Sequence, residues 1–169
     1  MRMPEPVSPR IRDYTEADAA ATLTIFTDAI METAAADYSA EQLTAWARPG
    51  ERDLTSWHGA MSERNSFVAV AAGSIVGFSD VTGDGFIDML FVAPAWGGRG
   101  VARALLAEAL TRARVAGAHE LTADVSITAR PVFERLGFEM YRRQEIVREG
   151  VALTNFRMRK AVRADQGIA

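Results

Sequence analysis

The chain has 169 residues, of which 49% are hydrophobic and 24% charged, and this balance indicates one globular domain. A formal net charge of −3 gives no electrostatic reason to expect nucleic acid as a partner. The absence of cysteine excludes a disulfide scaffold, a thiolate metal site and an acyl-cysteine intermediate. We also expect no metal, because the two histidines, His58 and His119, lie far apart in sequence. Without a signal-peptide pattern or a membrane-length apolar run, a cytoplasmic protein with no membrane association is expected.

The first half of the chain is predicted to be mainly helical. After a loose leader at residues 1–9, the expected elements are a strand at Arg10–Tyr14, a helix beginning at Thr15, and short helices at 40–47 and 53–61. Thr15 suits an N-cap because its hydroxyl can accept a hydrogen bond from the first turn. Ser39 and Gln42 have the spacing of a capping box, which predicts the start of the second helix.

The second half mixes strands with helices. The expected strands are at residues 66–72, 74–81, 86–92, 120–125, 138–147 and 151–159, and the expected helices are at 98–116 and 128–136. Gly73 marks a hairpin turn, and Gly117 and Gly137 suit helix C-caps. Hairpins combined with strand-helix-strand crossovers predict an α/β fold, in which helices cover the faces of a mixed sheet. A polar tail is expected at residues 161–169.

A glycine-rich segment joins the strand at 86–92 to the long helix. It contains Gly97, Gly98 and Gly100, with Arg99 between them. Glycine adopts backbone conformations that a Cβ forbids and lets a ligand approach closely. The free N–H groups of the following helix N-terminus attract anions. The segment therefore predicts a site for a pyrophosphate group.

Two other pyrophosphate-binding motifs fit this segment less well. The P-loop string GxxxxGK[ST] does not occur in the chain. A dinucleotide fingerprint GxGxxG is matched at only two of its three glycines, Gly98 and Gly100. Asp124 follows at the end of the next expected strand, roughly 20 residues on, where an acid that binds ribose would lie. NAD binding is therefore kept as an alternative that depends on Asp124.

Two segments together resemble the motifs of the GNAT N-acetyltransferase superfamily. Residues Leu90 to Ala102 resemble motif A, Q/R-x-x-G-x-G/A, with Gly97 in the Q/R position and Gly100 and Ala102 in the small-residue positions. Residues Ala129 to Phe138 resemble motif B, A-x-x-F-Y-E-K-x-G-F. Asp37 to Trp46 is also similar to the DYS-x-EQL-x-x-W stretch of a poorly characterised bacterial branch. The likeness extends from Arg10 to Arg159.

This resemblance implies a single GNAT domain over residues 1–169, with a central, mostly antiparallel sheet, one splayed parallel pair and flanking helices. It implies acetyl-CoA as the cofactor, with the pyrophosphate on the motif A loop and an N–H such as that of Phe91 stabilising the oxyanion. The residues that it assigns to the cofactor are Leu90, Phe91, Val92, Gly97, Gly98, Arg99, Gly100, Val101, Ala102, Arg103, Ser126 and Phe133.

The implied reaction is acetyl transfer to a primary amine of a small molecule, by direct attack in a ternary complex. Alternatives are a protein N-terminus or lysine as acceptor, or a non-catalytic acyl-CoA-binding module. Phe133 replaces the motif B tyrosine that often protonates the leaving thiolate, so Tyr38 and Tyr141 become candidate acids. Resemblance to this family also implies a homodimer.

Asp88 is the candidate general base. It is a carboxylate within an otherwise apolar expected strand, where its side chain would share a face with Leu90 and Val92. Such a carboxylate is costly unless it is functional or paired, for example with an arginine. Glu145 could share the task. Tyr38, taken as catalytic, and Trp46 are expected at the wall of the acceptor site.

Overall fold

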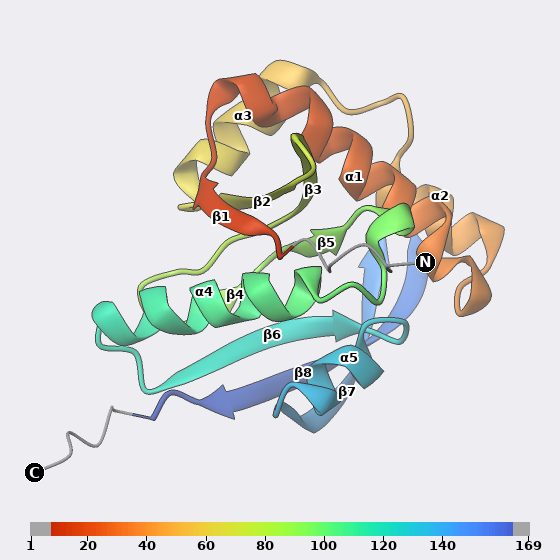
Figure 1. Ribbon diagram of the computed structural model, residues 1–169. Coiled ribbons are helices and arrows are strands. Elements are labelled where there is room, and N and C mark those ends of the chain that lie inside the picture. Colours follow the sequence, from red (N-terminus) through yellow and green to blue (C-terminus); the bar gives the residue numbers. More distant parts are fainter. Residues whose placement is uncertain (1–7, 164–169) are drawn as a thin grey trace, which may run out of the picture.

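The structure is a computed structural model that describes residues 8–163 (Figure 1). Its elements are β1 (Arg10–Asp13), η1 (Glu16–Asp18), α1 (Ala19–Met31), η2 (Thr33–Ala36), α2 (Ala40–Ala47), α3 (Leu54–Glu63), β2 (Phe67–Ala71), β3 (Ser74–Ser79), β4 (Phe86–Ile87), β5 (Leu90–Val92), η3 (Pro94–Trp96), α4 (Val101–Val115), β6 (Glu120–Ser126), α5 (Arg130–Arg135), β7 (Glu139–Arg148) and β8 (Val151–Ala161). Most of the predicted leader and tail lies outside the described residues, but β8 continues to Ala161, one residue into the predicted tail.

The strands form two four-stranded sheets. One has the order β1-β2-β3-β5 with antiparallel neighbours throughout, and the other has the order β4-β6-β8-β7. In the second sheet β4 and β6 are parallel, whereas the remaining pairs are antiparallel. The predicted α/β fold, mostly antiparallel with one parallel pair, is confirmed. Because β4 and β5 follow each other directly, the chain passes from one sheet to the other between them.

The single strand predicted at residues 86–92 is wrong, because the chain breaks at Asp88 and Met89. The Asp80 carboxylate accepts hydrogen bonds from the N–H groups of both residues, at 2.8 and 3.3 Å. The Ser79 hydroxyl donates to the carbonyl of Met89 at 2.7 Å. These side chains occupy backbone groups that a continuous strand would offer to a neighbour. As a result β4 pairs with β6, β5 pairs only with β3, and the parallel neighbours diverge.

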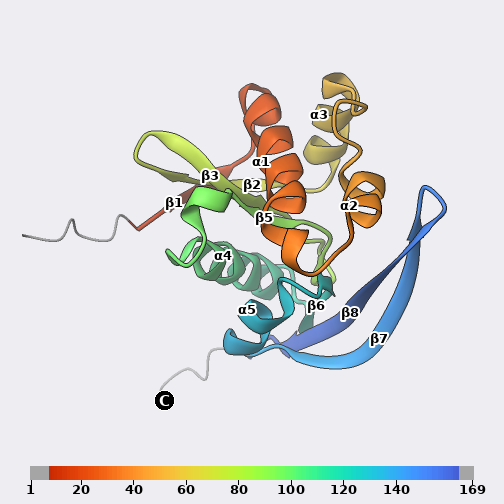
Figure 2. The same ribbon diagram turned by 90° about the vertical axis from the view of Figure 1, so that its right-hand side faces the viewer.

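Helices cover both faces of the first sheet. In Figures 1 and 2, α1 and α3 lie on one side of β2 and β3, and α4 lies on the other. The core beneath α4 contains Phe67 and Leu105, and the core beneath α1 and α3 contains Val68 and Phe78. Adjacent strand residues such as Phe67 and Val68 enter different cores because side chains alternate across a strand. None of the described helices is long and apolar enough to span a membrane.

Local signals set several helix boundaries. The predicted capping box is confirmed, since Ser39 and Gln42 exchange hydrogen bonds at 2.8 and 3.2 Å at the start of α2. Helix α4 begins at Val101 and not at Gly98 as predicted. Gly98 and Gly100 have φ angles of +72° and +83°, outside the right-handed helical region. The glycine-rich segment is therefore a loop that leads into the helix.

Replacing Gly77 by alanine is expected to lower the free energy of unfolding by about 1–3 kcal/mol, through overpacking. A Cβ at this position would lie 2.9 Å from Val101 Cγ1 and 3.0 Å from the Phe91 carbonyl oxygen. Urea denaturation measures the effect. Gly59→Ala in α3 is the control, because its Cβ would meet no atom within 4 Å and alanine favours helix. Equal stability of Gly77→Ala and the native protein would contradict close packing between β3 and α4.

Candidate active site

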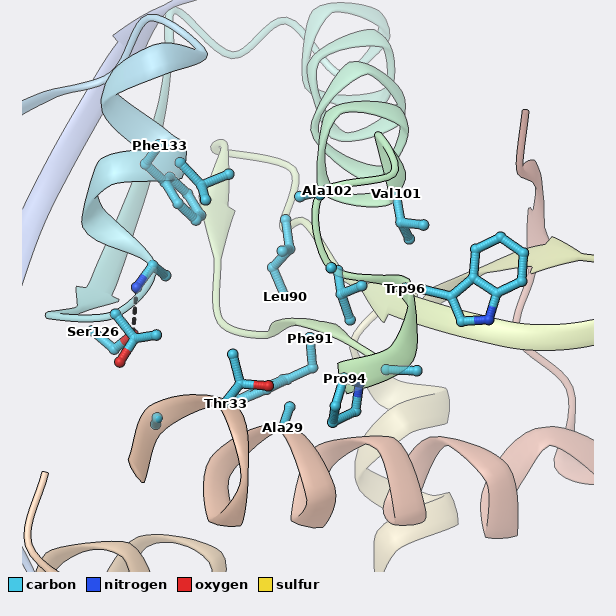
Figure 3. A pocket seen from close by; sticks show the side chains of 18 of the residues that line it. Ala29, Thr33, Leu90, Phe91, Pro94, Trp96, Val101, Ala102, Ser126 and Phe133 are labelled. Carbon is cyan, nitrogen blue, oxygen red and sulfur yellow. Dashed lines mark hydrogen bonds between the residues drawn. The ribbon is translucent and has the colours of Figure 1, made fainter. Parts of the chain in front are cut away.

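A cavity of about 460 Å³ lies where β5 and β6 diverge. Its walls come from the N-terminus of α4, from α5, and from the end of α1 (Figure 3). Every residue predicted to bind the cofactor lines this cavity except Arg99. Those lining residues are Leu90, Phe91, Val92, Gly97, Gly98, Gly100, Val101, Ala102, Arg103, Ser126 and Phe133. The structure thus brings motif A and motif B to opposite sides of one space.

Strand β5 has one edge without a strand partner among the described residues. It pairs with β3 in the register Leu90 with Ser79, Phe91 with Phe78 and Val92 with Gly77. The Ala93 N–H donates to Val76, so in this antiparallel ladder Phe91 also directs its backbone groups to β3. The prediction that the Phe91 N–H stabilises an oxyanion is therefore wrong. The backbone groups that face the diverging edge belong to Leu90 and Val92, because these alternate with Phe91 along the strand.

The loop before α4 can receive an anion. The first helical hydrogen bond from a backbone N–H into this loop runs from Ala104 to Gly100 at 3.1 Å. The N–H groups of Val101, Ala102 and Arg103 therefore have no partner within the helix. A Cβ built on Gly98 or Gly100 would meet no atom within 4 Å, so open space lies beside both glycines. Free N–H groups next to open space at a helix N-terminus suit a phosphate.

Arginines add positive charge at this end of the cavity. Arg103 and Arg135 line it, from α4 and α5 respectively. Arg99 instead stacks on the ring of Trp96, with its guanidinium carbon 4.9 Å from the ring centroid. Arg135 was missed by the sequence analysis, although a basic residue in the last turn of α5 was a usable signal. Two guanidinium groups can each donate charge-assisted hydrogen bonds to phosphate oxygens.

On the side of α5, Phe133 and Ser126 line the cavity. The Phe133 ring is buried against Phe138, at 5.0 Å between ring centroids. The Ser126 hydroxyl accepts a hydrogen bond from the Ala129 N–H at 3.0 Å and so supports the start of α5 (Figure 3). No tyrosine lines the described cavity. An apolar ring thus occupies the position where motif B usually carries a phenol.

Tyr38 lies beside the cavity and not in its lining. Its buried hydroxyl donates to the Thr154 carbonyl at 2.7 Å and accepts from the Ile127 N–H at 2.9 Å. Burial raises the pKa of this phenol above its usual value. The Tyr38 ring packs edge-on against Trp46, which does line the cavity. Tyr38 therefore joins β8 and the residue that follows β6 to the wall of the site. Its role as an acid stays a prediction.

Asp88 also lies outside the cavity lining. It sits in the break between β4 and β5, where its exposed carboxylate forms an ion pair with Arg64. The predicted common strand face with Leu90 and Val92 is absent, because the break interrupts the alternation. The sequence left two explanations for this carboxylate, a catalytic role or pairing with an arginine, and the structure contains the pairing. Its role as a base remains a prediction. Glu145, on β7, accepts a hydrogen bond from the Thr154 hydroxyl at 2.6 Å.

Asp124, on which the NAD alternative depends, is held by other side chains. Arg157 Nη2 donates to it at 2.9 Å and Gln144 donates at 2.7 Å. It does not line the cavity. Within residues 8–163 no cluster of three or more acidic or histidine side chains is arranged to hold a metal ion. The cavity presents the helix N-terminus, two arginines, a few hydroxyl groups and apolar walls.

One wall of the cavity, formed by the end of α1 and by η2, was not predicted from the sequence. Ala29, Thr33 and Ala34 line the cavity there. Figure 3 shows Ala29 and Thr33 pointing toward Phe91 of β5. These side chains are small, so they leave space between α1 and the strand. Ala29 lies within α1, whereas Thr33 and Ala34 belong to η2, which begins after the end of α1 at Met31. Helical spacing in the sequence therefore gave no signal for this wall.

Comparison with known proteins identifies the family. Residues 34–160 match the model of the acetyltransferase (GNAT) domain. The chain is 38% identical over 150 residues to YafP of Escherichia coli K12, an uncharacterized N-acetyltransferase, covering 89% of this chain and 94% of YafP. A GCN5-related N-acetyltransferase from Rhodopseudomonas palustris superposes with a TM-score of 0.87 at 34% identity, over 95% of this chain and 98% of that protein.

The fold recurs in YncA of Salmonella typhimurium, which was solved with its cofactor acetyl-CoA. That structure has a TM-score of 0.67 at 22% identity and covers 92% of this chain and 95% of its own. The family match spans most of this chain and agrees with the resemblance found in motifs A and B. This chain belongs to the GNAT family of acetyltransferases, which are acyl-group transferases.

Proposed function

We propose that this protein transfers the acetyl group of acetyl-CoA to a primary amine of a small molecule. The observation that carries the proposal is one cavity that contains both an anion-binding helix N-terminus and the diverging edge of β5. An anion site alone suits many phosphorylated ligands. An adjacent strand edge also suits a ligand with amide groups in an extended arm, as coenzyme A has.

The residues present fit acetyl-CoA. The N–H groups of Val101, Ala102 and Arg103 and the Arg135 guanidinium would hold its pyrophosphate. The backbone groups of Leu90 and Val92 would bind its amide-containing arm. One of their N–H groups would then stabilise negative charge on the thioester oxygen during attack by the amine. Such a donor lies on a strand held rigidly by β3 and needs no rearrangement.

Two side chains, Asp88 and Tyr38, are the candidates for proton transfer. Asp88 would accept the proton of the attacking amine, and it must share its carboxylate with Arg64 to do so. Tyr38 would have to give up its hydrogen bond to Thr154 before it could protonate the thiolate. A free thiol has a pKa of about 8.5, so its thiolate can leave near neutral pH without a dedicated acid. The direct reaction in a ternary complex is therefore consistent with phenylalanine at position 133.

Isothermal titration with acetyl-CoA, followed by a panel of small primary amines with released CoA as the readout, tests this function. We expect binding at micromolar concentration and CoA release with at least one amine. The same panel with peptides that carry a free N-terminus or lysine tests the protein-acceptor alternative. Binding without CoA release from any acceptor would indicate an acyl-CoA-binding module. Absence of binding at millimolar acetyl-CoA would contradict the proposal altogether.

A further inference from the structure

Arg52 takes no part in the reaction proposed above, yet its side chain is held in a fixed position near the site. It lies in the loop between α2 and α3 and is half-buried. Its Nε donates to the Ala47 carbonyl at 3.0 Å and its Nη2 donates to the Trp46 carbonyl at 3.1 Å. Its guanidinium carbon lies 4.6 Å from the centroid of the Phe26 ring. These contacts fix the guanidinium group and leave its Nη1 end and part of Nη2 free to donate.

The fixed guanidinium lies close to the strand that would hold the thioester. The Phe26 ring beneath it contacts the Phe91 ring edge-on, at 4.9 Å between centroids. Trp46, whose carbonyl accepts from Arg52, has its ring 6.3 Å from that of Phe91. Both Trp46 and Phe91 line the cavity. Arg52 itself does not line the cavity, but it contacts Trp46 directly and Phe91 through the Phe26 ring.

Other charged groups gather around Arg52 from three further elements. Burial first, and then the positive charges of Arg48, Arg148 and Arg64, lower the pKa of Arg52. Arg48 at the end of α2 is paired with Glu51 and with Glu149 of the β7–β8 turn. Arg64, after α3, is paired with Asp88. Figure 2 shows α2, α3 and the β7–β8 hairpin on the same side of the molecule.

The charges in this cluster are not balanced. Arg52 and Arg148 have no carboxylate partner among the described residues, whereas Arg48 and Arg64 do. A half-buried cation among other cations is stabilised when an anion binds beside it. The planar end of a guanidinium group can bind a carboxylate through two parallel hydrogen bonds. Asp88 in the same cluster supplies the opposite charge that an ammonium group would need.

We propose that Arg52, assisted by the charge of Arg148, binds a carboxylate group of the acceptor, so that the preferred acceptors are amines that also carry a carboxylate. This inference rests on the proposed function and names the substrate class of the same site. The amine would lie toward Asp88 and β5, and the carboxylate would lie against the Nη1 and Nη2 atoms of Arg52. A neutral amine would leave these arginines without a partner.

Matched pairs of acceptors test the proposal directly. β-Alanine is compared with β-alaninamide, and 4-aminobutyrate with 4-aminobutyramide, by kcat/KM from released CoA. We expect the native protein to prefer the acid over the amide by at least about tenfold in one pair. In Arg52→Gln this ratio should fall toward one. Arg10→Gln on β1 changes the net charge equally at an exposed position far from the cluster, and should keep the native ratio.

A second variant keeps the test decisive if Arg52→Gln does not fold, since Arg52 also binds the carbonyls at the end of α2. Arg148 is exposed, so Arg148→Gln should fold and should lower the same ratio. Equal kcat/KM for acids and amides in the native protein would overturn the carboxylate site while leaving the acetyltransferase proposal in place. An unchanged ratio in both variants would do the same. No CoA release from any amine would overturn both proposals.

Discussion

Gly100→Asp is expected to weaken acetyl-CoA binding by at least about a hundredfold. Gly100 has a φ angle of +83° and is the N-cap of α4, with open space where a Cβ would lie. An aspartate there would place a Cβ and a negative charge where the pyrophosphate is expected to approach the free N–H groups of the helix. Like charges only a few ångströms apart in a partly buried site repel strongly. Isothermal titration calorimetry measures the change in affinity.

Gly117→Asp provides a matched control for this change. Gly117 follows the opposite end of the same helix, has a φ angle of +84°, and has no atom within 4 Å of a built Cβ. The two variants therefore share the backbone strain and the added charge. Gly117→Asp should lower stability and leave acetyl-CoA affinity unchanged. Equal affinity of Gly100→Asp and the native protein would remove the glycine-rich loop from the cofactor site.

Asp80→Asn is expected to change how stability depends on pH. Burial raises the pKa of the Asp80 carboxyl group to about 6, although the N–H groups of Asp88 and Met89 partly oppose that rise. Asp80 is 2% exposed, and its Oδ2 has no hydrogen-bond partner within residues 8–163. Ionisation is therefore less favourable in the folded protein than in the unfolded chain, where the pKa is about 3.9.

The direction in which stability changes with pH follows from the difference in proton binding between the folded and unfolded states. Between pH 4 and 6 the folded protein holds this proton more tightly than the unfolded chain does, so the contribution of Asp80 is present below pH 4 and is lost as the pH rises through 6. Asparagine cannot ionise, and its carbonyl oxygen can still accept from Asp88 and Met89. The free energy of unfolding of Asp80→Asn minus that of the native protein should therefore rise by about 3 kcal/mol between pH 3.5 and 7.5.

Asp18→Asn is the control with the opposite expectation. A hydrogen bond from Arg12 lowers the pKa of Asp18, so ionised Asp18 stabilises the folded protein and this stabilisation is lost as the pH falls. The difference curve of Asp18→Asn should therefore fall as the pH rises. Urea titrations at a series of pH values measure both curves. A flat curve for Asp80→Asn would show that the folded protein holds this carboxyl group with an ordinary pKa.

Features that depend on neighbours in the chain could be predicted from the sequence. Ser39 and Gln42 are three residues apart, and their hydrogen bonds start α2 where expected. The glycines at 97, 98 and 100 share the cavity with the start of α4 because they precede it directly. Cap hydrogen bonds and the backbone freedom of glycine act over a few residues. The same local patterns placed motif A and motif B, and with them the family and most of the cavity lining.

Only the tertiary structure decided which distant groups meet. The break at Asp88 and Met89 depends on the side chains of Ser79, at the end of β3, and of Asp80, which follows it, so the apolar run alone predicted a continuous strand. Tyr38 binds backbone groups 89 and 116 residues away, which keeps it outside the cavity lining. Backbone N–H and C=O groups alternate between the two edges of a strand. Only when the neighbouring strand is known does this alternation show which residues, here Leu90 and Val92 of β5, face the free edge. Such partners are selected by packing of the whole domain, and no local propensity encodes them.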